Sequence, residues 1–97
     1  MEPDALSEAL RAATTDGAKL RALRQHAGIS LNALARESDL DKGYLSHVEN
    51  GHVPPPTGPT WERYERALLA PFAGSDHETA RHALAGIANV GTLSTAR

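Results

Sequence analysis

Two short helical segments, each with its own start and stop signals, occupy residues 28–51 of this chain. Ser30 suits the N-cap of the first segment, because its hydroxyl can accept a backbone N–H of the first turn. Leu34 and Ala35 then share one side of the helix, which should stop near Asp39. Aspartate tolerates the left-handed conformation better than most residues, so the chain can turn sharply there. A helix this short needs a partner to be stable, and the next segment supplies one.

The second segment, residues 41–50, has an apolar side and a polar side. Asp41 suits its N-cap, and Gly51 suits the position just past its end. Leu45 and Val48 lie three residues apart, on the side that should face a core. The opposite side offers groups that contact base edges or phosphates in DNA complexes, namely Lys42, Gly43, Ser46, His47 and Asn50. The two segments together therefore predict a helix-turn-helix.

Over residues 17–69 the chain resembles the phage-repressor-like (XRE-type) helix-turn-helix domains of bacterial transcription regulators. The residues that carry this resemblance are Leu23-Arg24, Gly28-Ile29-Ser30, Leu34-Ala35, Tyr44-Leu45-Ser46, Val48-Glu49-Asn50-Gly51, Pro56 and Ala67-Leu68. The resemblance implies an all-α fold, a lambda-repressor-like bundle of about five short helices. It also implies that residues 41–50 form a recognition helix that lies in the major groove.

The resemblance further implies roles for individual residues. Base contacts are expected from Lys42, Gly43, Ser46 and His47. Phosphate contacts are expected from Tyr44 and Asn50, and the hydroxyls of Ser30 and Thr57 are added as candidates. Arg24 and Glu49 should form a structural ion pair that ties the first helix of the motif to the end of the recognition helix.

Three residues depart from the pattern of these domains. Leu31 stands where many relatives carry a glutamine that grips a phosphate, Ser38 where an apolar residue is usual, and Asp39 where glycine is common in the turn. The segment after the recognition helix also lacks the usual basic residues, and residues 52–60 hold four of the six prolines instead. We therefore expect a looser or strained turn, followed by a stiff extended loop.

The 97 residues suit a single domain, with the helix-turn-helix core at residues 17–70. A helical arm is expected on either side, at residues 3–14 and 75–90, followed by a frayed tail at 91–97. The apolar residues that recur at helical spacing in the arms are Leu6, Ala9, Leu10 and Ala13, then Ala80, Ala83, Leu84 and Ile87. Ser75 and Glu78 have the form of a capping box at the start of the second arm.

The charge balance limits how strongly this chain can bind DNA without sequence preference. The formal net charge is −2, with −3 in residues 1–16, +1 in residues 17–53 and zero in the remainder. Few phosphates are neutralised per subunit, so non-specific binding should be weak and depend little on salt. Tight binding then requires two copies, which predicts a homodimer on a two-fold DNA operator.

Other classes of protein are disfavoured by the sequence. There is no cysteine, no apolar stretch long enough for a membrane span, and no secretory signal, so we expect a cytoplasmic protein with no membrane partner. His77, Glu78 and His82 nearly match the zinc motif H-E-x-x-H, but these histidines are five residues apart and fall on different helix faces. No cofactor or metal site and no arranged nucleophile is recognisable, so we do not expect an enzyme.

The sequence therefore predicts a sequence-specific DNA-binding transcriptional regulator. Two alternatives stay open. In the first, the chain is the antitoxin of a toxin–antitoxin pair, and a helical arm binds the protein partner. In the second, it is a protein-interaction adaptor that has lost DNA binding, an alternative that rests on the acidic balance and on Leu31.

Overall fold

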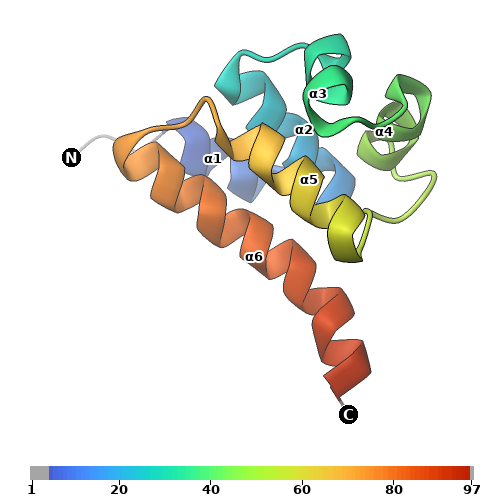
Figure 1. Ribbon diagram of the computed structural model, residues 1–97. Helices are drawn as coiled ribbons and strands as arrows, with labels where there is room; N and C mark the ends of the chain where they lie inside the picture. Colours follow the sequence, from blue (N-terminus) through green and yellow to red (C-terminus); the bar gives the residue numbers. More distant parts are fainter. Residues whose placement is uncertain (1–4, 97) are drawn as a thin grey trace.

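The computed structural model describes residues 5–96, and side chains within residues 5–87. Six α-helices and no strands occupy the described range, which confirms the all-α prediction but adds one helix to the expected number (Figure 1). They are α1 (Ala5–Ala12), α2 (Asp16–Ala27), α3 (Leu31–Ser38), α4 (Lys42–Glu49), α5 (Gly58–Leu69) and α6 (Gly74–Ala96).

The helices surround one core, to which every helix contributes. α4 packs against α2 and α3, while α5 packs against α2, α3 and α6. α6 runs along the other side of the bundle, where it contacts α1, α2 and α5 (Figure 1). Fully or almost fully buried side chains of the core include Leu6, Leu20, Leu23, Leu34, Leu45, Val48, Tyr64, Leu68, Ala80 and Leu84.

The two helix caps and the left-handed conformation of Asp39 are as the sequence predicted. The Ser30 hydroxyl accepts the backbone N–H of Ala33 at 3.0 Å, and the Asp41 carboxylate accepts that of Tyr44 at 3.0 Å. Asp39 takes the left-handed conformation at φ 58° and ψ 44°. Because both helices have satisfied N-termini, the helix-turn-helix keeps its geometry despite the short length of each helix.

Two of the residues that depart from the family pattern, Ser38 and Leu31, are accommodated by contacts with α3, α5 and the core. Ser38 is fully buried, and its hydroxyl donates to the carbonyl of Leu34 at 2.6 Å. The Nε of Arg63 in α5 donates to the carbonyl of Ser38 at 3.1 Å, so α5 satisfies a carbonyl at the end of α3. Leu31 packs against the hydrophobic core and does not take the place of the phosphate-binding glutamine of related domains. The turn is therefore tied to the bundle and is not loose.

The two arms differ in detail from their predicted bounds. α1 covers Ala5–Ala12 of the expected 3–14, and residues 3–4 lie outside the described residues. α6 begins at Gly74, one residue before Ser75, so the predicted capping box does not form, and Glu78 pairs with Arg81 instead. α6 also continues to Ala96, past the predicted bound of the arm at residue 90.

Candidate nucleic-acid interface

α4 presents its polar side to solvent and its apolar side to the core. Leu45 is fully buried and Val48 is 1% exposed, which confirms the predicted orientation. Lys42, Gly43 and His47 are exposed on the opposite side, where Ser46 is half-buried. The four residues expected to contact bases are therefore brought together on one accessible helix face.

A buried carboxylate joins α4 to α2. Glu49 is only 5% exposed, yet it accepts from Arg24 through both oxygens, at 2.7 Å from Nε and 3.0 Å from the second terminal nitrogen. Arg24 also donates to the carbonyl of Ile29 at 3.2 Å, and its hydrogen bond to Glu49 raises its pKa. The ion pair implied by the family resemblance is thus present. Its two-pronged geometry fixes the end of α4 against α2.

A glycine permits this close approach of α2 to α4. A Cβ atom added to Gly17 would lie 2.8 Å from the carbonyl oxygen of Glu49 and closer still to that of Val48. Both neighbours are backbone atoms, which cannot rotate away as a side chain can. The first turn of α2 therefore rests directly against the last turn of α4, and only glycine fits between them.

Asn50 and Arg21 form a second link between these helices that the sequence analysis missed. The side-chain oxygen of Asn50 accepts from Arg21 at 2.7 Å, and its nitrogen donates to the carbonyl of Ser46 at 2.9 Å. Arg21 also reaches Glu49 at 3.5 Å and keeps 44% of its side chain exposed. A cation therefore stands beside the end of α4, where the sequence predicted only an amide. Arg21 precedes Arg24 by three residues, so both arginines lie on one face of α2, and this spacing was the signal in the sequence for the contact.

The sequence itself places this chain in a family. Residues 17–85 match the helix-turn-helix domain family. This chain belongs to that family. The match begins at Gly17, the residue against which α4 packs, and extends into α6. Comparisons with curated proteins and with solved structures found no match.

The remaining predicted phosphate contacts lie around the helix-turn-helix, not on one helix. Tyr44 is half-buried on α4, and burial raises the pKa of its phenol, which therefore stays protonated and able to donate. Ser30 is exposed at the start of α3, and its hydroxyl, which accepts from Ala33, still has its own proton to donate. Thr57 is exposed in the loop before α5 and caps that helix without a side-chain hydrogen bond.

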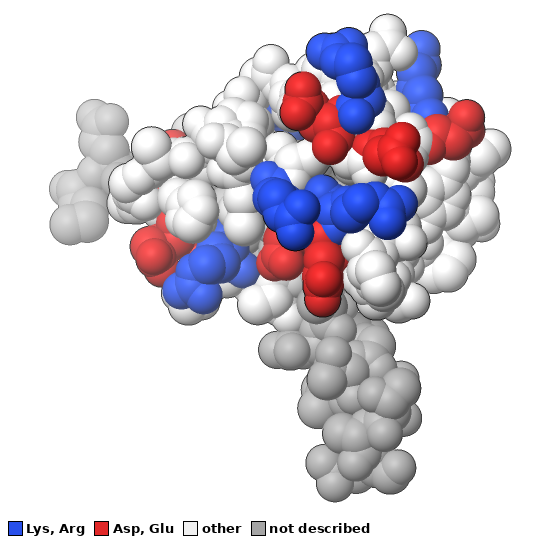
Figure 2. Space-filling model, viewed as in Figure 1, with Lys and Arg blue, Asp and Glu red and all other residues white. Residues whose placement is uncertain are grey.

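Charge is mixed on the visible face of the molecule. Figure 2 shows the Lys and Arg side chains interspersed with Asp and Glu across that face, with no broad patch of one sign. A polyanion would find only local positive charge there.

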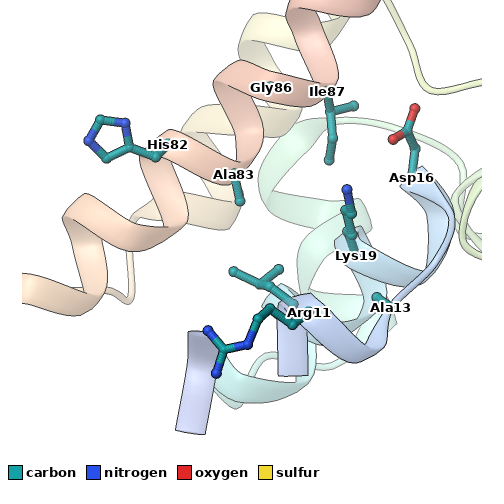
Figure 3. Close-up of a pocket in the computed structure, with 9 residues that line it drawn as sticks. Arg11, Ala13, Asp16, Lys19, His82, Ala83, Gly86 and Ile87 are labelled. Atoms are coloured by element: carbon teal, nitrogen blue, oxygen red, sulfur yellow. The ribbon is translucent and has the colours of Figure 1, made fainter. Parts of the chain in front are cut away.

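A second surface feature lies away from α4. A cleft of about 460 Å³ opens between α1, α2 and α6, and Figure 3 shows Ala83 and Ile87 of α6 directed toward the other two helices. Its other lining residues are Leu10, Arg11, Ala13, Asp16, Lys19, His82 and Gly86. None of the residues predicted to contact DNA lines it, so the cleft and the exposed side of α4 are separate surfaces.

Two structural patterns are missing from the described part of the chain, a cluster of metal-binding side chains and a membrane-spanning helix. Within it, no three potential metal-binding side chains gather, and His77 and His82 are accordingly not part of such a cluster. Each helix there is too short or too polar to traverse a bilayer.

Proposed function

We propose that this protein is a sequence-specific DNA-binding transcriptional regulator that inserts α4 into the major groove. The observation that carries the proposal is the division of α4 into two sides. Leu45, Val48 and Glu49 are buried, and Lys42, Gly43 and His47 are exposed on a helix whose start is capped. A short helix held this way is narrow enough for the major groove and offers donors to base edges.

Each exposed residue has a role in this proposal. The Lys42 ammonium donates to guanine or to a nearby phosphate, and the His47 imidazole and the Ser46 hydroxyl contact further base edges. Gly43 lets the backbone of α4 come close to the bases. Tyr44, Ser30 and Thr57 donate to phosphates, which sets the position of the helix along the groove.

Arg21 joins this set as a phosphate contact. Its guanidinium is held beside the end of α4 by Asn50 and Glu49, and nearly half of the side chain is exposed. The Asn50 side chain accepts from Arg21 through its oxygen, and its nitrogen donates to the carbonyl of Ser46 at 2.9 Å and to the Ser46 hydroxyl at 3.4 Å, so its polar atoms are already engaged within the protein. We assign the stronger phosphate contact in this region to Arg21, with Asn50 positioning it.

We further propose that the protein binds DNA as a homodimer. Each subunit supplies only a few cations to DNA, so one copy gains little from counterion release. Two copies on a two-fold site would place their α4 helices in successive major grooves, about 34 Å apart along the duplex. The helical arms α1 and α6 are the candidates for the contact between subunits.

Selection of binding sites from a random pool of DNA tests the proposal. We expect an enriched two-fold symmetric sequence whose half-sites are separated by about one helical turn. Enrichment of a single asymmetric half-site would contradict the dimer but not DNA recognition. No enrichment at all would contradict DNA recognition and favour the protein-interaction adaptor.

The antitoxin alternative is tested by a different measurement. If an arm helix neutralises a toxin, a small gene beside this one should encode a protein that co-purifies with this chain. Loss of that complex on substitution of an exposed side chain of α6, such as Arg81→Ala, with DNA binding retained, would establish the second role.

A further inference from the structure

The end of α4 is closed by a pair of backbone hydrogen bonds that bring two histidines together. The N–H of His52 donates to the carbonyl of His47 at 2.8 Å, and the N–H of Gly51 donates to that of Val48 at 3.1 Å. Gly51 has a positive φ of 78°. These bonds define a Schellman motif, in which the first and last residues commonly make an apolar side-chain contact. Here both positions hold an imidazole.

The two imidazoles form a hydrogen bond with each other. Their Nδ1 atoms are 3.3 Å apart, and the ring centroids are 5.5 Å apart. A neutral imidazole carries a proton on only one of its two nitrogens. One Nδ1 must therefore hold the shared proton while the other accepts it, and the two rings take opposite tautomers.

This hydrogen bond determines what the outer nitrogen of His47 can do. If His52 donates, the Nδ1 of His47 is bare and its Nε2 carries a proton, which suits the acceptors N7 and O6 of guanine. If His47 donates, its Nε2 is an acceptor, which suits the amino group of adenine or cytosine. Without the hydrogen bond, the tautomer ratio of His47 would no longer be linked to that of His52.

We propose that His52, which lies outside α4, is a positioning residue that sets the tautomer and ring orientation of His47 and so narrows its choice of base. The effect of His52 on base choice rests on the proposed function. Its effect on the tautomer of His47 is a property of the protein without DNA. The Schellman motif supports it, because backbone bonds hold both residues and the contact does not depend on side chains alone. Since both rings are exposed, removing His52 should leave the fold intact.

The first test measures tautomers by nitrogen NMR of the imidazole rings, on the full chain without DNA at pH 8, above the ordinary titration range of histidine. We expect opposite tautomers for His47 and His52 in the parent, and a changed tautomer ratio for His47 in His52→Ala. His82→Ala is the control, because that exposed ring is far along the chain in α6 and should leave His47 unchanged. An unchanged tautomer of His47 in His52→Ala overturns the inference, whatever the DNA results show.

The second test repeats the selection from random DNA with the parent, His52→Ala and His82→Ala. We expect His52→Ala to lose about fivefold of base preference at one position of each half-site, the equivalent of one hydrogen bond of about 1 kcal/mol. Preferences elsewhere should persist. A uniform loss at all positions, or none, contradicts a specificity role. If the parent selects no sequence, the proposed function fails, and the NMR result still decides whether His52 positions His47.

Discussion

The side of α4 that faces α2 and the side that faces solvent differ in how their polar groups are satisfied. Toward α2, Glu49 is buried and bound by Arg24 and Arg21, and Asn50 is bound by Arg21 and Ser46. On the solvent side, Lys42 forms no ion pair within the described residues. The comparison teaches that the polar groups facing α2 fix the position of α4, while the Lys42 ammonium and the outer nitrogen of His47, on the solvent side, are available to a ligand. Substitutions on the two sides should therefore change different measured quantities.

The largest effect is expected from Glu49→Ala, on the side that faces α2. This change leaves Arg24, whose side chain is only 14% exposed, with an unpaired and partly buried charge. Removal of one partner from a buried ion pair costs about 3–5 kcal/mol, and we expect the lower end because the arginines reach water. Urea denaturation of the parent and the variant measures the difference.

An exposed pair on α6 gives the matched control for Glu49→Ala. The Arg81–Glu78 pair has side chains that are 49% and 60% exposed, so Glu78→Ala should change the free energy of unfolding by less than about 1 kcal/mol. Equal losses in the two variants would show that the buried pair does not fix α4 against α2.

The next effect in size is expected from Gly17→Ala, which tests the close approach of α2 and α4. The new methyl group would overlap the backbone carbonyls of Val48 and Glu49, so the helices must separate. We expect a loss of about 1–3 kcal/mol in the free energy of unfolding. Gly86→Ala is the control, because nothing lies within 4 Å of its added methyl and helix propensity should give a gain. A gain for both variants would contradict the close packing.

On the solvent side, Lys42→Ala should leave the free energy of unfolding within about 0.5 kcal/mol of the parent value. Its affinity for the selected operator should fall by about 1–3 kcal/mol if the ammonium contacts a base. Fluorescence anisotropy with operator and random duplexes measures both affinities at one salt concentration. Equal losses on the two duplexes would assign Lys42 to the phosphate backbone, and no loss on either would remove it from the interface.

A small effect on stability is also expected from Gly43→Ala, a substitution on the solvent side that should weaken DNA binding. Alanine is favoured over glycine inside a helix by about 1 kcal/mol, but the added methyl would lie 3.0 Å from the carboxylate of Asp41 that caps the helix. We expect the two terms to leave a net change below about 1 kcal/mol, with weaker operator binding because the backbone can no longer approach the bases. Unchanged operator affinity would contradict a close approach at this residue.

Much of the helix-turn-helix could be predicted from local sequence. Ser30 and Asp41 cap their helices, and Asp39 takes the left-handed conformation, because each of these depends on neighbours within three residues. Helical spacing predicted which side of α4 faces the core, and the family resemblance predicted the Arg24–Glu49 ion pair. The roles of the exposed residues toward DNA stay predictions.

Other features depended on packing between distant segments. Ser38 looked like a weakness of the turn until Arg63, 25 residues away, was found to satisfy its carbonyl. The start of α6 was misplaced by one residue, because a capping-box pattern does not by itself show where a helix begins.

The sequence by itself determined that this chain is helical, where its central helices begin and end, and which side of α4 faces the core. These properties follow from capping and from helical spacing, which act over a few residues. Only the tertiary structure decided that Arg21 stands beside Asn50, that Gly17 contacts the end of α4, and that a cleft opens between the arms. These contacts join residues far apart in the chain, so they depend on how the helices cross, which no local pattern encodes.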